Sequence, residues 1–208
     1  MKKLFLFPIF FMMISKCAVC QELKFGIRAG LSFSSQVIDD PDILSTTSIN
    51  TLKVTGFVDK AIGGGFFIEP GISLVGKGAK IYQNAQTDII SLTYLDIPVN
   101  IIYRFNVKRF GKLFVGGGPY IGFGLSGNDE TQNTNVTSGQ SITFEDTGDY
   151  KKTEYGGNAN GGVELNNHLT FYLNYCFGLN NIAGDQTISQ GTVSVKNRVF
   201  SVGLGFIF

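Results

Sequence analysis

Apolar and polar residues alternate strictly along most of this 208-residue chain. Residues 23–33, LKFGIRAGLSF, place Leu, Phe, Ile and Ala at every second position, with Lys, Gly, Arg and Ser between them. Successive side chains of a strand point to opposite faces, so this period of two predicts a strand with one bulky apolar face. Similar alternation predicts further strands at residues 51–59, 66–78, 92–105, 113–125, 154–165, 169–179 and 200–208. The first of these alternates least clearly, and we include it because an antiparallel barrel has an even number of strands.

The connections between the eight predicted strands alternate between short and long. Short links fall at about residues 59–65, 106–112 and 166–168, and long polar links at about residues 34–50, 78–91, 126–152 and 181–195. Short turns at one end and long loops at the other are typical of transmembrane β-barrels. The pattern therefore predicts an all-β fold, an eight-stranded antiparallel up-and-down transmembrane β-barrel with short periplasmic turns and long extracellular loops.

Alternation alone does not say which face points outward, since a soluble lipocalin-like barrel alternates as well. Here the apolar face carries nearly all the large side chains, and the other face is rich in Gly. The interior of an eight-stranded barrel is only just wide enough for side chains, so the apolar stripes would overfill it and should face lipid. The inward charges then need partners, because an unpaired buried charge is costly. We expect an interior polar network of Arg28, Glu69, Lys77, Asp96, Arg104 and Glu164.

The N-terminus has the features of a cleavable signal peptide. Two lysines precede an apolar segment that is too short to span a bilayer, and a small-x-small cleavage site ends at Cys20. We expect a signal peptide over residues 1–20 and one outer-membrane barrel domain over residues 21–208. Lipoprotein processing at Cys17 or Cys20 is the alternative. The mature chain keeps only Cys176, so no intramolecular disulfide can stabilise it.

Composition agrees with strands and argues against a nucleic-acid partner. The chain has 27 Gly, 19 Phe and no Trp, and only 16% of its residues are charged, which fits strands and turns better than helices. The formal net charge is +1, and removal of the three leader lysines lowers it to −2. No segment is basic and interleaved with aromatic residues, as a nucleic-acid-binding face would be.

Several of these strands resemble those of one family. YLDIPVNIIYRF is similar to the Tyr-Leu-Glu-Ile-Pro strand of the PorT-like outer-membrane β-barrel proteins of Bacteroidetes, with Asp96 where Glu is usual. FIEPGISLVGKG resembles that family's strand ending in Lys-Gly, and FGIRAGLSFS resembles its first strand. The sixth and seventh strands of the family are similar to NANGGVELNNHLTFYLNYCFGLNNI, and its last strand is similar to NRVFSVGLGFIF. The resemblance implies an integral outer-membrane barrel without implying one activity. PorT itself is linked to type IX secretion.

The chain ends on an apolar strand. Ser201, Gly203, Phe206 and Phe208 resemble the C-terminal β-signal of outer-membrane proteins, which the barrel-assembly machinery recognises. An aromatic edge strand can pair with a strand of the insertase by β-augmentation. We expect these four residues to act as an assembly signal. The alternative is a final lipid-facing strand with no recognition role.

No motif in the sequence predicts catalysis, a cofactor or a metal site. Residues 122–127, GFGLSG, match the dinucleotide motif G-x-G-x-x-G, but they lie in a predicted strand and open no helix. The single histidine, His168, maps to a periplasmic turn, whereas a hydrolase would need a base beside its nucleophile at the extracellular rim. We therefore expect a protein that is not an enzyme and that binds no cofactor.

Two classes of function remain. The first is a barrel scaffold that contacts outer-membrane lipid and partners a secretion or envelope complex. The second is a surface binding module whose long loops, above all residues 126–152, contact a ligand, a host surface or a glycan. A pore is not expected, because barrels of eight strands are filled by their own side chains. The mixed charge of the 126–152 link fits both classes.

Overall fold

A computed structural model describes residues 23–39, 43, 45–83, 86–107, 111–133, 136–145, 148–184 and 193–208. The predicted signal peptide, residues 1–20, lies outside these described residues. The strands are β1 (Leu23–Asp39), β2 (Ser45–Thr47), β3 (Ile49–Gly63), β4 (Phe66–Gln83), β5 (Gln86–Val107), β6 (Gly111–Asn133), β7 (Val136–Ser141), β8 (Thr153–Leu165), β9 (Leu169–Gly178) and β10 (Ser194–Ile207). No helix in the described segments is long and apolar enough to cross a membrane.

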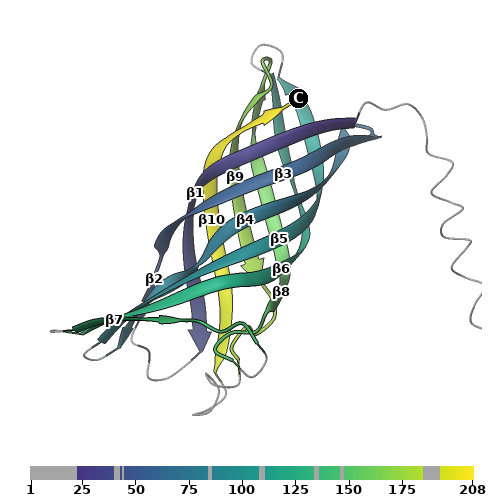
Figure 1. Ribbon diagram of the computed structural model, residues 1–208. Coiled ribbons are helices and arrows are strands. Elements are labelled where there is room, and N and C mark those ends of the chain that lie inside the picture. Colours follow the sequence, from purple (N-terminus) through teal and green to yellow (C-terminus); the bar gives the residue numbers. More distant parts are fainter. Residues whose placement is uncertain are drawn as a thin grey trace, which may run out of the picture.

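Eight of these strands close into a barrel (Figure 1). Neighbours pair antiparallel in the order β1-β3-β4-β5-β6-β8-β9-β10, and β10 pairs back with β1. The short strands β2 and β7 pair with β4 and β6 beyond the barrel wall. A closed ring leaves no free strand edge in the wall. The eight-stranded antiparallel barrel predicted from the alternation is confirmed.

The barrel closes between its first and last strands through paired glycines. Gly30 lies opposite Gly203 in the β1–β10 register. A Cβ atom at Gly203 would overlap the carbonyl oxygen of Ala29, and one at Gly30 would overlap that of Val202. The two strands therefore approach more closely at this point than any larger residue permits.

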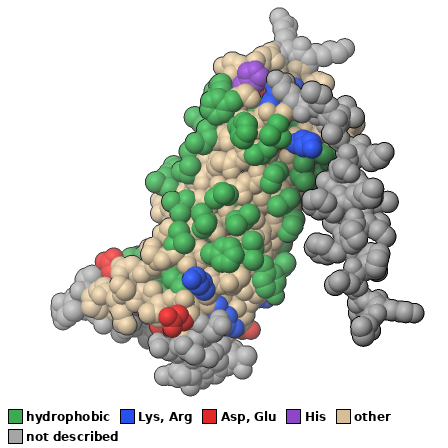
Figure 2. Space-filling model, turned by 45° about the vertical axis from the view of Figure 1, so that its right-hand side comes forward, with side chains coloured by type: hydrophobic (Ala, Val, Ile, Leu, Met, Phe, Trp, Pro, Cys, Tyr) green, Lys and Arg blue, Asp and Glu red, His purple; other side chains and the backbone are tan. Residues whose placement is uncertain are grey.

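An apolar belt surrounds the barrel. Figure 2 shows hydrophobic side chains spread over the wall and charged side chains toward its two ends. The exposed apolar residues occupy alternate positions on the barrel strands, for example Leu31 on β1, Leu173 on β9 and Leu204 on β10. This confirms that the apolar face points outward, and the alternative of a soluble barrel with an apolar lining is wrong.

Aromatic side chains gather at the end of the barrel where the short turns lie. The rings of Phe66 and Tyr103 have centroids 4.7 Å apart, and Tyr103 and Phe105 are 4.5 Å apart. Phe206 and Phe208 form a similar pair at 5.1 Å. Aromatic girdles mark the membrane interfaces of transmembrane barrels, so these rings mark the periplasmic interface.

The segment with the weakest alternation, residues 51–59, is confirmed as a barrel strand because it lies within β3. A glycine turn at residues 63–65 follows, with φ values of 106°, 62° and 85°. This left-handed backbone is readily adopted by glycine, which explains the three consecutive glycines. The equally short turn at residues 166–168 joins β8 to β9.

The prediction of long loops at residues 34–50, 78–91 and 126–152 is wrong for large parts of these links. β1, β4, β5 and β6 all continue into them, and β7 adds a further strand. Beyond the belt the outward face no longer has to be apolar, so the alternation weakens while the hydrogen-bonded ladder continues. The inward face still buries Ala79, Ile81 and Ile90. The ends of β4, β5 and β6 project from the barrel together with β7, at the lower left of Figure 1. We call this projection the extracellular sheet: β2, β7 and residues 78–83, 86–91 and 126–133 of β4, β5 and β6.

Three prolines interrupt the ladders of neighbouring strands. Pro70 lies on β4, Pro98 on β5 and Pro119 on β6. Residues 71–72 have no partners in the β4–β5 register, and residues 99–100 have none in the β5–β6 register. Proline has no N–H to donate to a ladder, so this part of the wall has fewer interstrand bonds than its surroundings.

Candidate functional site: barrel interior and extracellular sheet

The periplasmic half of the interior holds ion pairs built around Glu69. Its Oε2 accepts a hydrogen bond from Nη1 of Arg28 at 2.8 Å, and its Oε1 accepts one from Nη2 of Arg104 at 3.0 Å. All three side chains are buried. The guanidinium of Arg28 also lies 4.0 Å from the ring centroid of Phe57, and that of Arg104 lies 4.0 Å from that of Phe67. Charge pairing and cation–π contacts thus link β1, β3, β4 and β5 across the interior.

Two further carboxylates and a lysine complete this group. Nη1 of Arg104 donates to Oδ2 of Asp59 at 2.7 Å, and its Nε lies 3.3 Å from Oε2 of Glu164. Nζ of Lys112 donates to the other oxygen of Glu164 at 3.3 Å. Three cations therefore face three carboxylates, which compensates the cost of burying them. We call this group the periplasmic network: Arg28, Asp59, Glu69, Arg104, Lys112 and Glu164.

A second charged group lies closer to the extracellular end, around Lys77. Nζ of Lys77 lies 2.9 Å from Oδ1 of Asp96 and 3.1 Å from Oε2 of Glu154. The hydroxyl of Tyr120 donates to Oε1 of Glu154 at 2.7 Å, and the amide of Asn197 donates to Oε2 at 2.9 Å. The charged side chains are almost entirely buried, and every charge has a partner of opposite sign.

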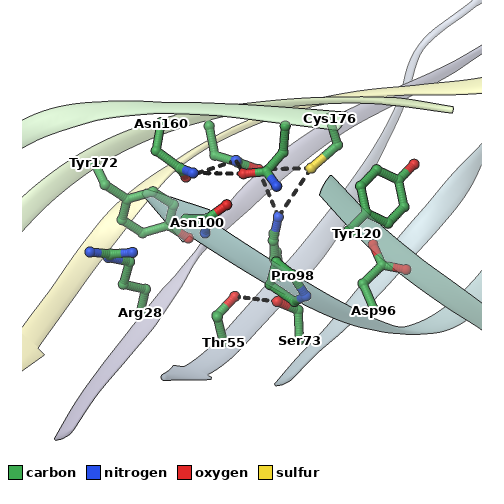
Figure 3. Close-up of a pocket in the computed structure, with 13 residues that line it drawn as sticks. Arg28, Thr55, Ser73, Asp96, Pro98, Asn100, Tyr120, Asn160, Tyr172 and Cys176 are labelled. Atoms are coloured by element: carbon green, nitrogen blue, oxygen red, sulfur yellow. Dashed lines mark hydrogen bonds between the residues drawn. The ribbon is translucent and has the colours of Figure 1, made fainter. Parts of the chain in front are cut away.

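A small polar cavity of about 20 Å³ lies beside this group (Figure 3). Nζ of Lys53 donates to Oδ1 of Asn174 at 2.6 Å and to Sγ of Cys176 at 3.4 Å. The amide of Asn174 in turn donates to Oδ1 of Asn160 at 2.9 Å. Lys53 and Asp96 both line this cavity, so a second positive charge lies in the same part of the interior as the two carboxylates beside Lys77. A cavity of this size has room for about one water molecule.

An apolar cluster closes the interior at its extracellular end. Ile182, from the segment after β9, is fully buried, and Leu92 of β5 is nearly so. The ring of Phe144, from the segment after β7, packs edge-on against Tyr94 with centroids 5.6 Å apart. Side chains therefore occupy successive levels of the barrel. The buried members of this apolar cap are Val75, Ala79, Ile81, Ile90, Leu92, Tyr94, Tyr120, Tyr150, Cys176, Ile182, Ala183, Val193, Val195 and Val199.

The structure places all six predicted interior residues inside the barrel, in two separate groups. Four of them belong to the periplasmic network, and Lys77 and Asp96 pair with each other nearer the extracellular end. The sequence prediction missed Lys53, Asp59 and Glu154. Lys53 and Asp59 occupy inward positions of β3, where the alternation is weakest, and Glu154 is the first inward position of β8. A consistent period of two through both strands could have found them.

The extracellular sheet carries carboxylates close to one another. Oγ1 of Thr131 donates to Asp88 at 2.9 Å. Burial raises the pKa of Asp129 above its usual range, and the negative charges of Asp88 and Asp149 raise it further. In the part of the chain that the structure describes, no group of three or more His, Cys, Asp or Glu side chains could hold a metal ion.

Comparison with known families identifies the barrel. The family described as "Outer membrane protein beta-barrel domain" matches residues 16–184, which is most of the chain. The chain belongs to this family. The outward apolar belt of this outer-membrane barrel therefore faces membrane lipid, with its short turns in the periplasm and its extracellular sheet outside the cell.

Solved structures of outer-membrane proteins are similar to this outer-membrane barrel at low sequence identity. Ail, the attachment invasion locus protein of Yersinia pestis, is 13% identical with a TM-score of 0.43, covering 90% of this chain and 99% of that chain. OprG from Pseudomonas aeruginosa is 14% identical with a TM-score of 0.47, covering 90% and 97%. Neisserial surface protein A is 12% identical with a TM-score of 0.46, covering 88% and 96%. No curated protein matches the sequence.

The last strand of the outer-membrane barrel contains three of the four residues predicted to form an assembly signal, and Phe208 follows its last residue directly. Ser201 points inward, and Gly203 lies at the close contact between β10 and β1. Phe206 and Phe208 point outward at the periplasmic interface, and the backbone N–H of Phe208 donates to the carbonyl oxygen of Phe25 at 2.7 Å. The two outward aromatic residues thus lie at the membrane edge of the strand that closes the barrel.

The two side chains with nucleophilic or base chemistry singled out from the sequence lie far apart along the barrel. His168 is exposed at the periplasmic turn between β8 and β9, with its ring 6.3 Å from that of Phe206. Cys176 is a free, buried cysteine beside the polar cavity. The outer-membrane barrel therefore does not bring them together as a nucleophile and its base.

Proposed function

We propose that this protein is a non-enzymatic, non-conducting outer-membrane barrel that presents its extracellular sheet as a binding surface. The observation that carries the proposal is the contrast between a filled interior and a sheet that extends well beyond the belt. A channel needs a continuous aqueous path, whereas the periplasmic network, the Lys77 group and the apolar cap occupy successive levels of this barrel.

The length and bonding of the extracellular sheet support a binding role. On β4, Gln83 lies nine positions beyond Leu74, the last exposed apolar residue of that strand. At about 3.3 Å per residue this is about 30 Å of strand beyond the belt. The β4–β5 ladder continues to the end of this segment, and β5 continues to pair with β6. A surface ordered before contact loses less conformational entropy on binding than a flexible loop does.

The resemblance of residues 94–105 to PorT-like proteins of Bacteroidetes favours a second candidate, a scaffold role in type IX secretion. In both roles, residues 1–20 act as a cleavable signal peptide. After export, insertion by the barrel-assembly machinery is directed by Ser201, Gly203, Phe206 and Phe208. The filled interior suits a scaffold as well as an anchor, so the extracellular sheet is the element to test.

A shortened β6–β7 hairpin separates the two roles. Asp129 and Gln140 are partners in the β6–β7 register, so residues 130–139 can be replaced by an Asn-Gly turn that keeps the remaining β6–β7 pairs. The replacement also removes the β6 partners of residues 87–89 of β5, so it shortens the extracellular sheet on both sides of β6. The segment from residue 142 to residue 150, which contributes to the apolar cap, stays intact. A gel shift between unheated and boiled samples serves as the control that the shortened barrel folds.

The assays are binding of the purified protein in lipid nanodiscs to arrays of glycans and extracellular-matrix proteins, and secretion of cargo by cells carrying each variant. The proposal predicts that wild-type protein binds at least one array probe, that the shortened variant loses this binding, and that secretion is unchanged. Loss of secretion with unchanged binding would contradict the binding role and support the scaffold. Absence of binding by the wild-type protein would also contradict the proposal.

A further inference from the structure

Basic residues follow the last lipid-facing aromatic residue of β10. Phe200 is exposed in the belt, and the next outward positions toward the extracellular end are Arg198 and Lys196. Arg198 lies ten positions before Phe208, which is at the periplasmic interface. At about 3.3 Å per residue and a tilt of about 40°, these residues span about 25 Å, the height of the apolar band of a transmembrane barrel. Arg198 and Lys196 therefore lie at the level of the outer-leaflet headgroups.

Two more lysines reach the same level immediately before β8. The backbone N–H of Lys151 donates to the carbonyl oxygen of Ile182 at 2.8 Å, and the N–H of Ile182 donates to that of Val195 at 3.0 Å. Only one segment of chain therefore separates Lys151 from the start of β10. Lys152 follows directly and is exposed. We call this group the basic rim: Lys151, Lys152, Lys196 and Arg198.

The backbone holds Arg198 in place at the wall of the barrel. Its Nη1 donates to the carbonyl oxygen of Gly178 at 2.7 Å and to that of Asn197 at 3.1 Å. A guanidinium fixed in this way loses little further freedom when it binds a phosphate, and its planar fork suits two phosphate oxygens. Lys196 and Lys151 are half-buried beside it, so their stems also have limited freedom.

Aromatic residues lie beside and beneath the basic rim, with Phe177 opposite Arg198 in the β9–β10 register. Phe33 and Phe200 stack with centroids 6.4 Å apart, Tyr175 and Phe177 lie 6.3 Å apart, and Tyr155 is exposed on β8. This pairing of cations above and apolar rings below fits a molecule with phosphate at one end and acyl chains at the other.

The other side of the barrel differs at the same level. Its outward positions above the belt include Gly76 on β4, Thr93 on β5 and Ser126 on β6, which are small and uncharged. Asp39, opposite Ser194 in the β1–β10 register, is an acidic residue at the upper edge of the basic rim. At this level the positive charge is therefore on the β8–β10 side, and the outward Lys80 of β4 lies further from the belt, in the extracellular sheet.

We propose that the basic rim binds the phosphate groups of outer-leaflet lipid headgroups, with the acyl chains lying on the aromatic surface beneath. The site fixes which side of the barrel an anionic lipid occupies. This lipid site does not depend on the binding role proposed for the extracellular sheet. That sheet projects from the opposite side of the barrel, from β4 to β7.

The test compares lipids with and without phosphate. Purified protein in neutral detergent micelles is titrated with diphosphorylated lipid A and with the same lipid after removal of both phosphates, and bound lipid is counted by native mass spectrometry. The test variant carries Lys151→Gln, Lys152→Gln, Lys196→Gln and Arg198→Gln. The control carries Lys60→Gln and Lys80→Gln, which remove two outward charges elsewhere on the barrel.

Wild type and control should bind diphosphorylated lipid A equally, and the test variant should bind it roughly tenfold or more weakly. Wild type should bind the phosphate-free lipid as weakly as the test variant binds lipid A. Equal binding of both lipids by wild type, or equal loss in test variant and control, overturns the proposal. Displacement of lipid A by millimolar inorganic phosphate also overturns it, because this shows a simple anion site. If the fourfold variant does not fold, Arg198→Gln alone should weaken binding, and unchanged binding then overturns the proposal.

Discussion

Replacing Glu69 by glutamine tests whether charge pairing holds the barrel interior together. The carboxylate of Glu69 is shared by Arg28 and Arg104, and its side chain has no exposed surface. Arg104 keeps Asp59 and Glu164 as partners in the Glu69→Gln variant. Among the described residues, Glu69 is the one carboxylate within ion-pair distance of Arg28. The substitution therefore leaves one buried guanidinium without a counter-charge, while the size of the side chain hardly changes.

The expected loss of stability follows from the burial of this pair. Removing one partner of a buried ion pair typically costs about 3–5 kcal/mol. The cation–π contact between Arg28 and Phe57 remains and lies at 4.0 Å, but it does not replace the lost charge. We therefore expect the free energy of unfolding of Glu69→Gln to fall by about 3 kcal/mol, which is more than a hundredfold in the unfolding equilibrium. The chain has no Trp, so urea unfolding in micelles is followed by circular dichroism and by the gel shift of the folded barrel.

Lys112→Gln is the matched control, because Lys112 belongs to the same network but 43% of its side chain is exposed. An exposed ion pair contributes at most about 1 kcal/mol, so this variant should unfold close to wild type. The double variant Glu69→Gln with Arg28→Met should recover part of the loss, since it removes the unpaired charge as well. A Glu69→Gln variant no less stable than Lys112→Gln would refute the role assigned to the network.

Further substitutions test other parts of the account. Gly203→Val should sharply reduce the folded fraction on the gel, because its side chain has no room against β1, whereas Gly56→Val on the outer wall, where a Cβ meets no atom within 4 Å, should fold normally. Because burial raises the pKa of Asp129, its protonated form is favoured in the folded sheet, so hydrogen-exchange protection of residues 128–133 should be greatest in acid. That protection should fall as the pH rises from the ordinary Asp pKa of about 3.9 through the higher folded value, and Asp129→Asn should abolish the change, which exchange mass spectrometry can check. Phe208→Ala should slow insertion by purified assembly machinery in proteoliposomes, whereas Phe200→Ala, which also removes an outward ring of β10, should not, and equal rates would show that Phe208 is only a lipid-facing residue.

The strands of the barrel could be predicted because one face is constrained by lipid. In β1, Leu31 must face the membrane and Arg28 must not, so the period of two is strong and fixes the orientation of each residue. The inward position of charges such as Glu69 and Arg104 follows from the same pattern. β3 shows the limit of this approach, since Lys53 and Asp59 were missed where the alternation weakens.

The partners of the inward charges could not be predicted from the pattern. Alternation gives the face of each residue, whereas the pairing of Lys77 with Glu154, which lies three strands away around the barrel, depends on tilt and stagger. The extracellular sheet was missed for a different reason. Residues 86–91 and 126–133 are hydrogen-bonded strands beyond the belt, where no lipid requires one face to be apolar, so their sequence is typical of a loop.

The central claim is that the apolar belt of a closed barrel faces the lipid of the outer membrane. Fractionated cell membranes run on a detergent gel, unheated and boiled, test it most directly. The account predicts that the protein is found in the outer-membrane fraction and that the unheated form migrates differently from the boiled form, because the hydrogen-bonded ring resists detergent until it is heated. A protein recovered in the soluble periplasmic fraction, with the same mobility before and after boiling, would contradict the account.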